Sequence, residues 1–468
     1  MTKHTMARAK LSEKIGYGFG DFASSMFWKI FSYYLPIFYS DVFGLKPVHA
    51  ATLLLVTKLY DAVSDPLMGI IADRTNSKWG KYRPYLLWIA IPFALIGIAS
   101  FYVPDSTYTL KHIYAYVMYI LMMTVYTAIN VPYGAMLGVV TDDSREKSVF
   151  SSFRMFFAYI GSFVAMGIFW IFEKIVIGQG GRGVGDATPG QWTITVAIVA
   201  ALCAVLFLLS FFMTREHVKI EKKETGSSIG KDLKSLVSNR PWWLLLGAAI
   251  GQLLCGSIRG GAAAYYFANI LGADIWLTCA VYLTIGEIGQ MVGVTFAVPL
   301  SERYGKRNTF IGSLVAVIIF SCLIWFIPVA SASGLWMLIG LQVLVSLAFG
   351  VAAPLTWSMF ADVADYSELR NGNSSTGLIF SSSSMAQKFG GAIGGWLLLT
   401  LLGIFGYNKD LAVQAPETLG AIKAVMSWVP AIGALISIGF LTLYPLTSAK
   451  MKEIQEKLQL QRASSTLL

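Results

Sequence analysis

The sequence predicts an all-α membrane protein with twelve transmembrane helices in two pseudo-symmetric six-helix bundles. Of the 468 residues, 56% are hydrophobic and only 13% are charged, with a mean hydropathy of +0.62, whereas soluble domains are about 25% charged. Apolar stretches long enough to cross roughly 30 Å of hydrocarbon follow one another with short connections. One charged stretch, at 214–240, divides them into six and six.

The expected spanning segments each hold about 20 predominantly apolar residues. In chain order they are 17–42, 49–72, 84–104, 112–138, 150–173, 192–213, 242–270, 276–299, 309–329, 335–361, 375–405 and 424–446. The expected domains are an N-terminal bundle at 1–213, a cytoplasmic linker at 214–240, a C-terminal bundle at 241–446 and a cytoplasmic tail at 447–468.

The net charge of +10 is explained by membrane orientation. If both termini are cytoplasmic, 25 of the 36 Lys and Arg residues lie in inside segments and six in outside loops. This bias is the positive-inside rule. It predicts a multi-pass protein of the plasma (inner) membrane with both termini in the cytoplasm. Its surroundings are then a lipid bilayer, and no nucleic-acid partner is implied.

Two loops in corresponding places carry a similar motif. The chain reads "ADRTNSKWGKYRP" between the second and third segments and "SERYGKRN" between the eighth and ninth. Both place an acid–Arg pair before a Gly flanked by Lys or Arg. In addition, Pro132 and Asp143 have the same spacing as Pro354 and Asp365. An internal repeat of six helices is typical of one class of secondary transporters.

These loops resemble the cytoplasmic loop motif of the major facilitator superfamily, where the acid, Arg and Gly lie at the inner gate. The resemblance implies the major facilitator fold. It also implies a gating role for five loop residues: Asp73, Arg74, Lys81, Glu302 and Arg303.

Nine charged residues fall within the expected spanning segments. They are the acids Asp21, Asp61, Asp65 and Glu287 and the bases Lys29, Lys58, Arg154, Arg259 and Lys388. Each costs at least about 2.5–3.5 kcal/mol near the bilayer centre, and such groups usually face a cavity on an ion or substrate path. Their near balance predicts mutual pairing across an aqueous cavity.

Asp61 and Asp65 are four residues apart, so both project from one helix face about 6 Å apart. Ser64 lies on the adjacent arc and adds an oxygen. Charged oxygen ligands suit a hard cation such as Na⁺, so Na⁺ at Asp61 and Asp65 is one interpretation. Two close carboxylates also raise each other's pKa, so that one of them carries a proton. The structural alternative is a pair neutralised by Lys58 or Arg154.

The stretch "VYTAINVPYG" places Thr127 and Asn130 three residues apart, so both offer oxygens to the same neighbour. Pro132 frees a backbone carbonyl nearby, which is a further ligand for a cation. Alternatively, this segment is a packing kink.

Five segments, "GYGFGDFASS", "LYDAVSDPLMG", "SKWGKYRP", "YTAINVPYG" and "ADVADYSE", resemble the glycoside–pentoside–hexuronide:cation symporters, the melibiose permease-like family of the major facilitator superfamily. The resemblance covers essentially the whole chain. It implies a secondary active transporter that imports a glycoside or oligosaccharide by symport with Na⁺ or H⁺. Its partners are then a small-molecule glycoside and a monovalent cation or proton, with no cofactor.

The resemblance also assigns residues. Asp61 and Asp65 match the family's cation-site carboxylates, and Thr127 matches its hydroxyl ligand. Arg154 matches an Arg that contacts sugar, and Lys388 matches a Lys near the cation site and the sugar site.

Other positions depart from the family pattern. Ser24 and Ser25 stand where the family has Lys-Asp, Asn130 replaces an Asp shared by cation and sugar, and Gly134 replaces a Trp. We therefore expect the coupling machinery to be kept and the sugar site to be remodelled.

Lys29, Arg154 and Arg259 are candidates for binding a substrate carboxylate through charge-assisted hydrogen bonds, which favours a hexuronide. The alternative is that these bases pair with Asp21 and Glu287. Aromatic residues on the same helices, Tyr126, Tyr266 and Trp357 above all, are expected to stack on sugar rings. For each of them the alternative is packing or anchoring at the membrane interface.

Two other functions remain open at this point. The first is a transporter with the same fold whose substrate is another amphiphile, such as a lysolipid; this function needs a lateral apolar portal. The second is a membrane-embedded enzyme, but the sequence has no H-E-x-x-H, G-x-S-x-G or Walker motif. We therefore expect no enzymatic activity.

Overall fold

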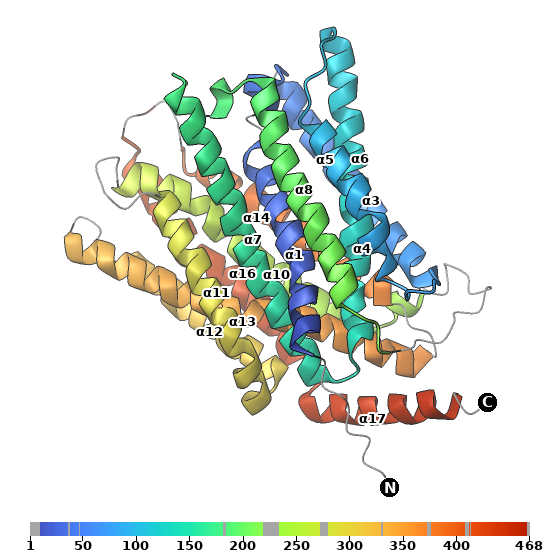
Figure 1. The fold of residues 1–468 in the computed structure, drawn as a ribbon. Helices are drawn as coiled ribbons and strands as arrows, with labels where there is room; N and C mark the ends of the chain where they lie inside the picture. The colour runs from blue at the N-terminus through green and yellow to red at the C-terminus, as the bar shows by residue number, and fades with distance from the viewer. Residues whose placement is uncertain are drawn as a thin grey trace. The chain divides into compact units, whose positions relative to one another are not determined.

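The computed structural model describes residues 10–35, 38–45, 47–180, 184–218, 234–271, 279–328, 331–371, 376–407, 411 and 413–465. The chain forms two compact units. Unit 1 holds Met1–Ile229 with Ser374–Ser381, and unit 2 holds Gly230–Asn373 with Ser382–Leu468. Within the described residues all extended regular structure is helical (Figure 1), which confirms the all-α class.

Unit 1 is built on six spanning segments. Its elements are α1 (Leu11–Tyr33), η1 (Phe38–Val42), α3 (Pro47–Arg74), α4 (Pro84–Trp88), α5 (Ala90–Ser100), α6 (Tyr108–Val140), α7 (Ser144–Gly178), η2 (Val184–Asp186) and α8 (Pro189–Met213). Helix α1 packs against α7 and α8, while α3 packs against α6. The cation-site candidates on α3 and α6 therefore lie on adjacent helices.

Unit 2 repeats the plan with an added terminal helix. Its elements are α10 (Arg240–Tyr266), η3 (Phe267–Leu271), α11 (Cys279–Tyr304), α12 (Lys306–Leu323), η4 (Ile324–Phe326), α13 (Ala332–Asn371), α14 (Thr376–Ile404), α15 (Pro416–Met426), α16 (Val429–Thr442) and α17 (Ser448–Ser465). The first residues of α14, through Ser381, belong to unit 1. Helix α10 packs against α16, and α11 packs against α13.

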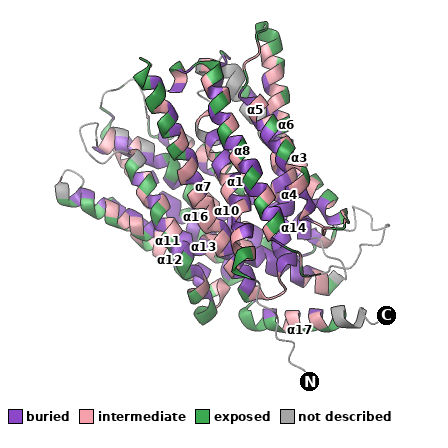
Figure 2. Ribbon diagram, viewed as in Figure 1, coloured by how far each residue is buried: buried purple, intermediate pink, exposed green. Residues whose placement is uncertain are grey.

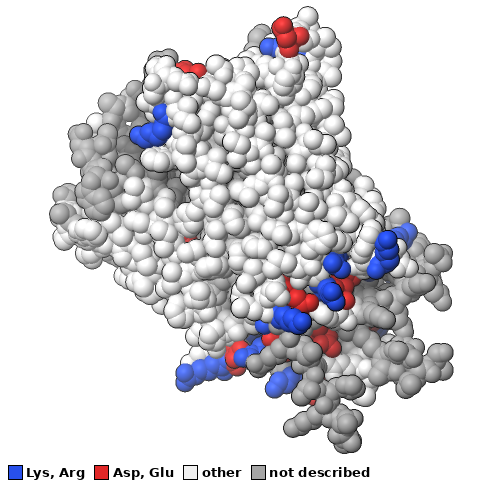
Figure 3. All heavy atoms as spheres, viewed as in Figure 1, with Lys and Arg blue, Asp and Glu red and all other residues white. Residues whose placement is uncertain are grey.

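Helix occupies the described part of all twelve expected segments. Over these described residues, nine helices are long and apolar enough to cross a membrane. Figure 3 shows the middle of the visible face as almost entirely free of charged side chains. The proposed domain boundaries stay a prediction.

Two expected segments are each divided into two helices. The third becomes α4 and α5, and the twelfth becomes α15 and α16. Pro92 and Pro430 lie just after the breaks, and neither can donate to the carbonyl four residues earlier. The twelfth helix also begins earlier than expected, at Pro416. Lys423, one of the six bases expected in outside loops, therefore lies within α15.

Local signals set several helix starts. Asp143 accepts a hydrogen bond from the amide of Arg145 at 2.8 Å and caps α7. Thr188 and Gln191 form a capping box ahead of α8, with Pro189 at the first helical position. These contacts satisfy backbone donors that a helix leaves unpaired at its N-terminus.

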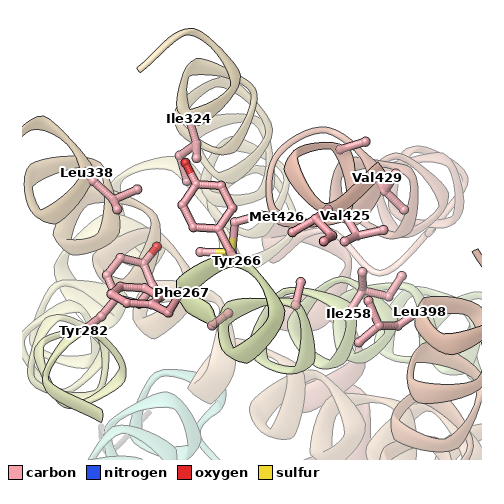
Figure 4. Close-up of a cluster of buried hydrophobic side chains, with 14 of the residues drawn as sticks. Ile258, Tyr266, Phe267, Tyr282, Ile324, Leu338, Leu398, Val425, Met426 and Val429 are labelled. Atoms are coloured by element: carbon pink, nitrogen blue, oxygen red, sulfur yellow. The ribbon is translucent and has the colours of Figure 1, made fainter. Parts of the chain in front are cut away.

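The core of each unit is rich in aromatic residues. In unit 1, Trp192 is fully buried and meets Phe38, Phe101 and Phe169 with ring centroids 5.3–5.9 Å apart. In unit 2, a cluster drawn from α10, η3, α11 and α15 surrounds Tyr266 (Figure 4). Figure 2 shows α17 with buried and exposed positions in turn, as expected of an amphipathic surface helix.

Candidate functional site

The structure brings two cation-site candidates of unit 1 into direct contact. Asp65 on α3 is 1% exposed and Thr127 on α6 is 4% exposed. The Thr127 hydroxyl donates to Asp65 Oδ1 at 2.8 Å. One turn away, Tyr60 Oη and Thr124 Oγ1 lie 2.7 Å apart, so the same two helices are bridged twice. Asp65 and Thr127 therefore form a buried pair of oxygen-bearing side chains.

The remaining cation-site candidates lie beside this pair in the sequence. Ser64 is partly exposed on α3. Asn130 on α6 donates its side-chain amide to the carbonyl of Tyr126 at 3.0 Å, one turn back along its own helix. Asp61 belongs to α3, but its side chain lies outside the described residues. Pro132 lies inside α6 and cannot donate to the carbonyl of Ala128.

These donors fit a hard cation. Carboxylate, hydroxyl and backbone carbonyl oxygens are the ligands that such ions prefer. Within the described residues, no group of three or more His, Cys, Asp or Glu side chains is placed to hold a metal ion.

Arg154, expected to contact sugar, forms a buried ion pair with Asp21. Its Nε donates to Asp21 Oδ2, and its Nη2 donates to Oδ1 at 3.3 Å. The guanidinium also lies 4.9 Å from the ring centroid of Tyr133. Tyr133 and Tyr17 each donate a hydroxyl to the other's backbone carbonyl, at 2.5 and 3.3 Å. This cluster joins α1, α6 and α7, and it places Asp21 with Arg154.

Arg259 in unit 2 has a different environment. It is 7% exposed and donates to Gln342 Oε1, to the Tyr282 hydroxyl at 3.0 Å and to Ser321 Oγ at 3.3 Å. All three partners are neutral, and among the described residues no carboxylate lies within ion-pair distance of this guanidinium. Of the expected alternative, in which the buried bases pair with Asp21 and Glu287, the structure shows the Arg154–Asp21 pair.

The other substrate-site candidates are dispersed. Lys29 on α1, Lys388 on α14 and Trp357 on α13 are all half-buried. Tyr126 packs against the Trp28 ring, with centroids 5.3 Å apart. Tyr266 is 1% exposed and lies in the packed core beside Phe267 (Figure 4), so in this structure it is a core residue without a free face for a sugar ring.

Next to Trp357, sequence reasoning missed a polar contact. Thr356 donates its hydroxyl to Gln252 Oε1 at 2.8 Å and so joins α13 to α10. In unit 1, Ser24, at a position where the family pattern differs, donates back to the carbonyl of Gly20 at 2.9 Å. Ser24 thus satisfies its hydroxyl within its own helix.

Asp73, at the end of α3, is the centre of the contacts around the first of the two loops that are predicted to form the gate, hereafter the first gate loop. It is 4% exposed and accepts from the Tyr82 hydroxyl at 2.6 Å, while Lys81 Nζ lies 3.3 Å away. It also accepts from the amides of Gly377 and Leu378, at 2.8 and 3.2 Å, in the first turn of α14. A carboxylate at a helix N-terminus is stabilised by the helix dipole and unpaired amides.

Burial, together with the neighbouring Asp73 carboxylate, raises the pKa of Tyr82 well above its ordinary value. The Tyr82 hydroxyl therefore remains a donor to Asp73 throughout the physiological pH range. Gly69 and Gly377 approach so closely that a Cβ at Gly69 would lie 2.7 Å from the Gly377 carbonyl oxygen. The loop and the start of α14 are thus held by charge, hydrogen bonds and close backbone packing.

Glu216 contacts the same loop, and it was not among the residues predicted from the sequence. It follows the sixth spanning helix, and its carboxylate accepts from the amides of Lys81, Tyr82 and Arg83 at 2.7–2.8 Å. Gly80 has a φ of +116°, and a Cβ there would lie 2.5 Å from the Glu216 carboxyl carbon. The only sequence signal was an acid just after the last apolar segment of the bundle.

The second gate loop is held differently. Lys306 pairs with Asp362 of α13 at 2.7 Å. Arg307 donates to the carbonyl of Tyr444 at 3.1 Å, just as Arg83 donates to that of Phe211 at 2.8 Å in unit 1. The predicted gate residues Arg74, Glu302 and Arg303 are exposed, whereas Lys81 is half-buried.

Known proteins of similar sequence cover almost the whole chain. The provisionally named glycoside/cation symporter YagG of Escherichia coli (strain K12) is 36% identical over 98% of this chain and 97% of its own. The isoprimeverose transporter of Lactiplantibacillus pentosus is 30% identical over 95% and 91%. The glucuronide carrier protein homolog of Escherichia coli (strain K12) is 29% identical over 94% and 93%.

Solved structures support the fold. The Escherichia coli fucose:proton symporter FucP matches 93% of this chain and 98% of its own with a TM-score of 0.66 at 14% identity. A bacterial homologue of the iron transporter ferroportin matches 92% and 99% with a TM-score of 0.65 at 11% identity. At these identities the likeness concerns the fold alone, and it confirms the expected major facilitator architecture.

Residues 16–448 match the family described as MFS/sugar transport protein. The expected resemblance to the glycoside–pentoside–hexuronide:cation symporters is confirmed by the relatives, and so is the expectation that the protein is a transporter and not an enzyme. The chain belongs to the MFS/sugar transport family, whose members are multi-pass secondary transporters of the major facilitator superfamily.

Proposed function

We propose that this transporter imports a glycoside or an oligosaccharide together with Na⁺ or H⁺, and that the coupling ion binds at Asp65 and Thr127 with Asp61 beside them. The hydrogen bond between Asp65 and Thr127 is the observation that carries the proposal, because it places a buried carboxylate against a hydroxyl on a neighbouring helix. A charged group in that position is costly unless it serves an ion or substrate path.

The names of the relatives support the substrate class. They include a glycoside/cation symporter, an isoprimeverose transporter and a glucuronide carrier homolog. The distribution of Lys and Arg supports a bacterial inner-membrane location with both termini in the cytoplasm. Asp73, with Lys81 and Tyr82 around it, is proposed to stabilise the closed inner gate through the start of α14.

Within this class we propose an acidic glycoside, such as a hexuronide. The guanidinium of Arg259 is buried among neutral partners, whereas that of Arg154 is already neutralised by Asp21. A buried charge without a counter-ion is expensive, and a substrate carboxylate would supply the missing partner. Lys29 and Lys388 are further candidates for the same carboxylate.

Uptake by proteoliposomes tests the transport proposal. An inward gradient of one ion, Na⁺ or H⁺, is expected to drive accumulation of a glycoside, and an ionophore that collapses the gradient should abolish it. The panel should include neutral and acidic glycosides. If no glycoside accumulates under either gradient, the proposed coupling is wrong.

The Arg259→Gln variant is expected to raise KM for acidic glycosides by at least about tenfold, because hydrogen bonds to charged groups are worth roughly 1.5–3 kcal/mol. Uptake of neutral glycosides should change much less. Arg240→Gln, at an exposed position at the start of α10, the helix that carries Arg259, is the matched control. Equal losses for acidic and neutral substrates would instead assign Arg259 a structural role.

A further inference from the structure

Gln342, on α13, is a buried partner of Arg259 that carries no charge. Its side chain is 5% exposed, and its Oε1 accepts a hydrogen bond from Arg259 Nη2. A carbonyl oxygen orients a guanidinium but does not neutralise its positive charge. A glutamate side chain has nearly the same shape and would neutralise it. The choice between an amide and a carboxylate at position 342 therefore determines whether the guanidinium has a counter-ion within the protein.

The Gln342 amide is held in one orientation. Its Nε2 donates to the backbone carbonyl of Tyr282 on α11 at 3.3 Å. A carbonyl can only accept and a guanidinium can only donate, so a rotated amide would lose both hydrogen bonds. The Tyr282 hydroxyl accepts from Arg259 Nη2 at 3.0 Å, and its ring packs against Phe267 with centroids 5.2 Å apart (Figure 4). Gln342 and Tyr282 therefore position the guanidinium from two helices.

Gly286 on α11 provides the space for this amide. A Cβ at Gly286 would overlap Nε2 of Gln342 and would lie 3.1 Å from Ser346 Oγ. Both of these atoms belong to side chains, and the amide is the far end of a flexible one. A methyl group at position 286 would therefore displace the amide from its contacts before it disturbed the backbone of either helix.

We propose that Gln342 determines the preference of this transporter for acidic glycosides, because its neutral amide positions Arg259 and leaves the guanidinium charge to the substrate carboxylate. Gln342 is thus a positioning residue that acts through Arg259. This inference rests on the proposed import of an acidic glycoside. A carboxylate of the protein at position 342 would compete with the substrate for the same charge-assisted hydrogen bonds.

Uptake by proteoliposomes that contain the full chain tests this inference with one acidic and one neutral glycoside. Gln342→Glu is expected to raise KM for the acidic glycoside at least about tenfold, the scale of hydrogen bonds to a charged group. KM for the neutral glycoside should stay within about twofold of the wild type, which also shows that the variant is folded. Gln414→Glu is the matched control, since Gln414 is also 5% exposed and also donates to a backbone carbonyl.

Two results separate this inference from the function on which it rests. If Arg259→Gln loses the preference for the acidic glycoside and Gln342→Glu keeps it, the role of Gln342 is overturned and the proposed function stands. If Arg259→Gln also keeps the preference, the proposed recognition of an acid by Arg259 is wrong, and the inference falls with it. An equal rise in KM for both glycosides in Gln342→Glu would likewise overturn it.

A second variant moves the amide without adding a charge. Gly286→Ala is expected to raise KM for the acidic glycoside roughly threefold, the scale of one ordinary hydrogen bond, with little change for the neutral glycoside. Gly340→Ala on α13 is the matched control, because a Cβ there would meet no atom within 4 Å. An unchanged KM for the acidic glycoside in Gly286→Ala would contradict the positioning of Arg259 by this amide.

Discussion

Cation-driven sugar accumulation is expected to be lost in the Asp65→Asn variant. Asparagine keeps an oxygen that accepts from Thr127 but removes the negative charge, so hydrogen-bond geometry is preserved while the ion ligand is weakened. The measurement is uptake by proteoliposomes under the driving gradient, compared with equilibrium exchange of labelled sugar. Asp105→Asn, the same change at an exposed loop position, is the matched control.

The Thr127→Val variant tests the hydrogen-bond partner of Asp65. Removal of a group that orients an ion ligand typically lowers ion affinity roughly 10–100-fold. We therefore expect a higher ion concentration for half-maximal uptake with a similar maximal rate. Thr124→Val removes a hydroxyl one turn earlier on α6, where it meets Tyr60 and no carboxylate. Full gradient-driven accumulation in Asp65→Asn would place the coupling ion elsewhere.

The Asp21–Arg154 ion pair is expected to dominate the stability of unit 1. Asp21→Ala leaves a buried guanidinium without its counter-ion, and the breaking of a buried pair typically costs about 3–5 kcal/mol. The measurement is thermal unfolding of the purified protein in detergent, read as a shift in Tm. Replacement of Glu453, which forms exposed ion pairs with Lys450 and Lys457, should change Tm little.

A double-mutant cycle measures the interaction energy between Asp21 and Arg154 apart from the contacts that each makes with other residues. Asp21→Leu with Arg154→Leu removes both charges, and replacement of a buried pair by apolar residues is often neutral or stabilising. The double variant is therefore expected to recover most of the stability that Asp21→Leu loses on its own. Additive losses in the double variant would mean that the two side chains act independently.

The spanning segments were predictable because the bilayer imposes one simple requirement, about 20 apolar residues per helix. The breaks before Pro92 and Pro430 were not predicted, since hydropathy averages over a segment and ignores a single missing backbone donor. The contact between Asp65 and Thr127 was expected, because the family resemblance assigns both residues to one site. Spacing alone relates residues of one helix and cannot place two helices side by side.

For other side chains, the residue type did not predict the surroundings that the structure shows. Tyr266 was expected near substrate because aromatic residues suit sugar rings, but the same ring packs equally well in an apolar core. Arg259 was expected to meet either a substrate or Glu287, and the sequence did not predict the amide and the two hydroxyls to which it donates. Glu216 was missed because its partners are backbone amides, which carry no sequence signal.

The contact of Glu216 with the first gate loop has a counterpart in unit 2. Gly80 is covered by Glu216, just beyond α8, and a Cβ at Gly305 would lie 2.9 Å from Ser448 Oγ, just beyond α16. Arg83 donates to the carbonyl of Phe211 near the end of α8, and Arg307 donates to the carbonyl of Tyr444 just after α16. In each unit, therefore, a residue that follows the last spanning helix covers the glycine of the loop between the second and third spanning segments. A substitution at Glu216 or at Ser448 would accordingly act first on the loop of its own unit.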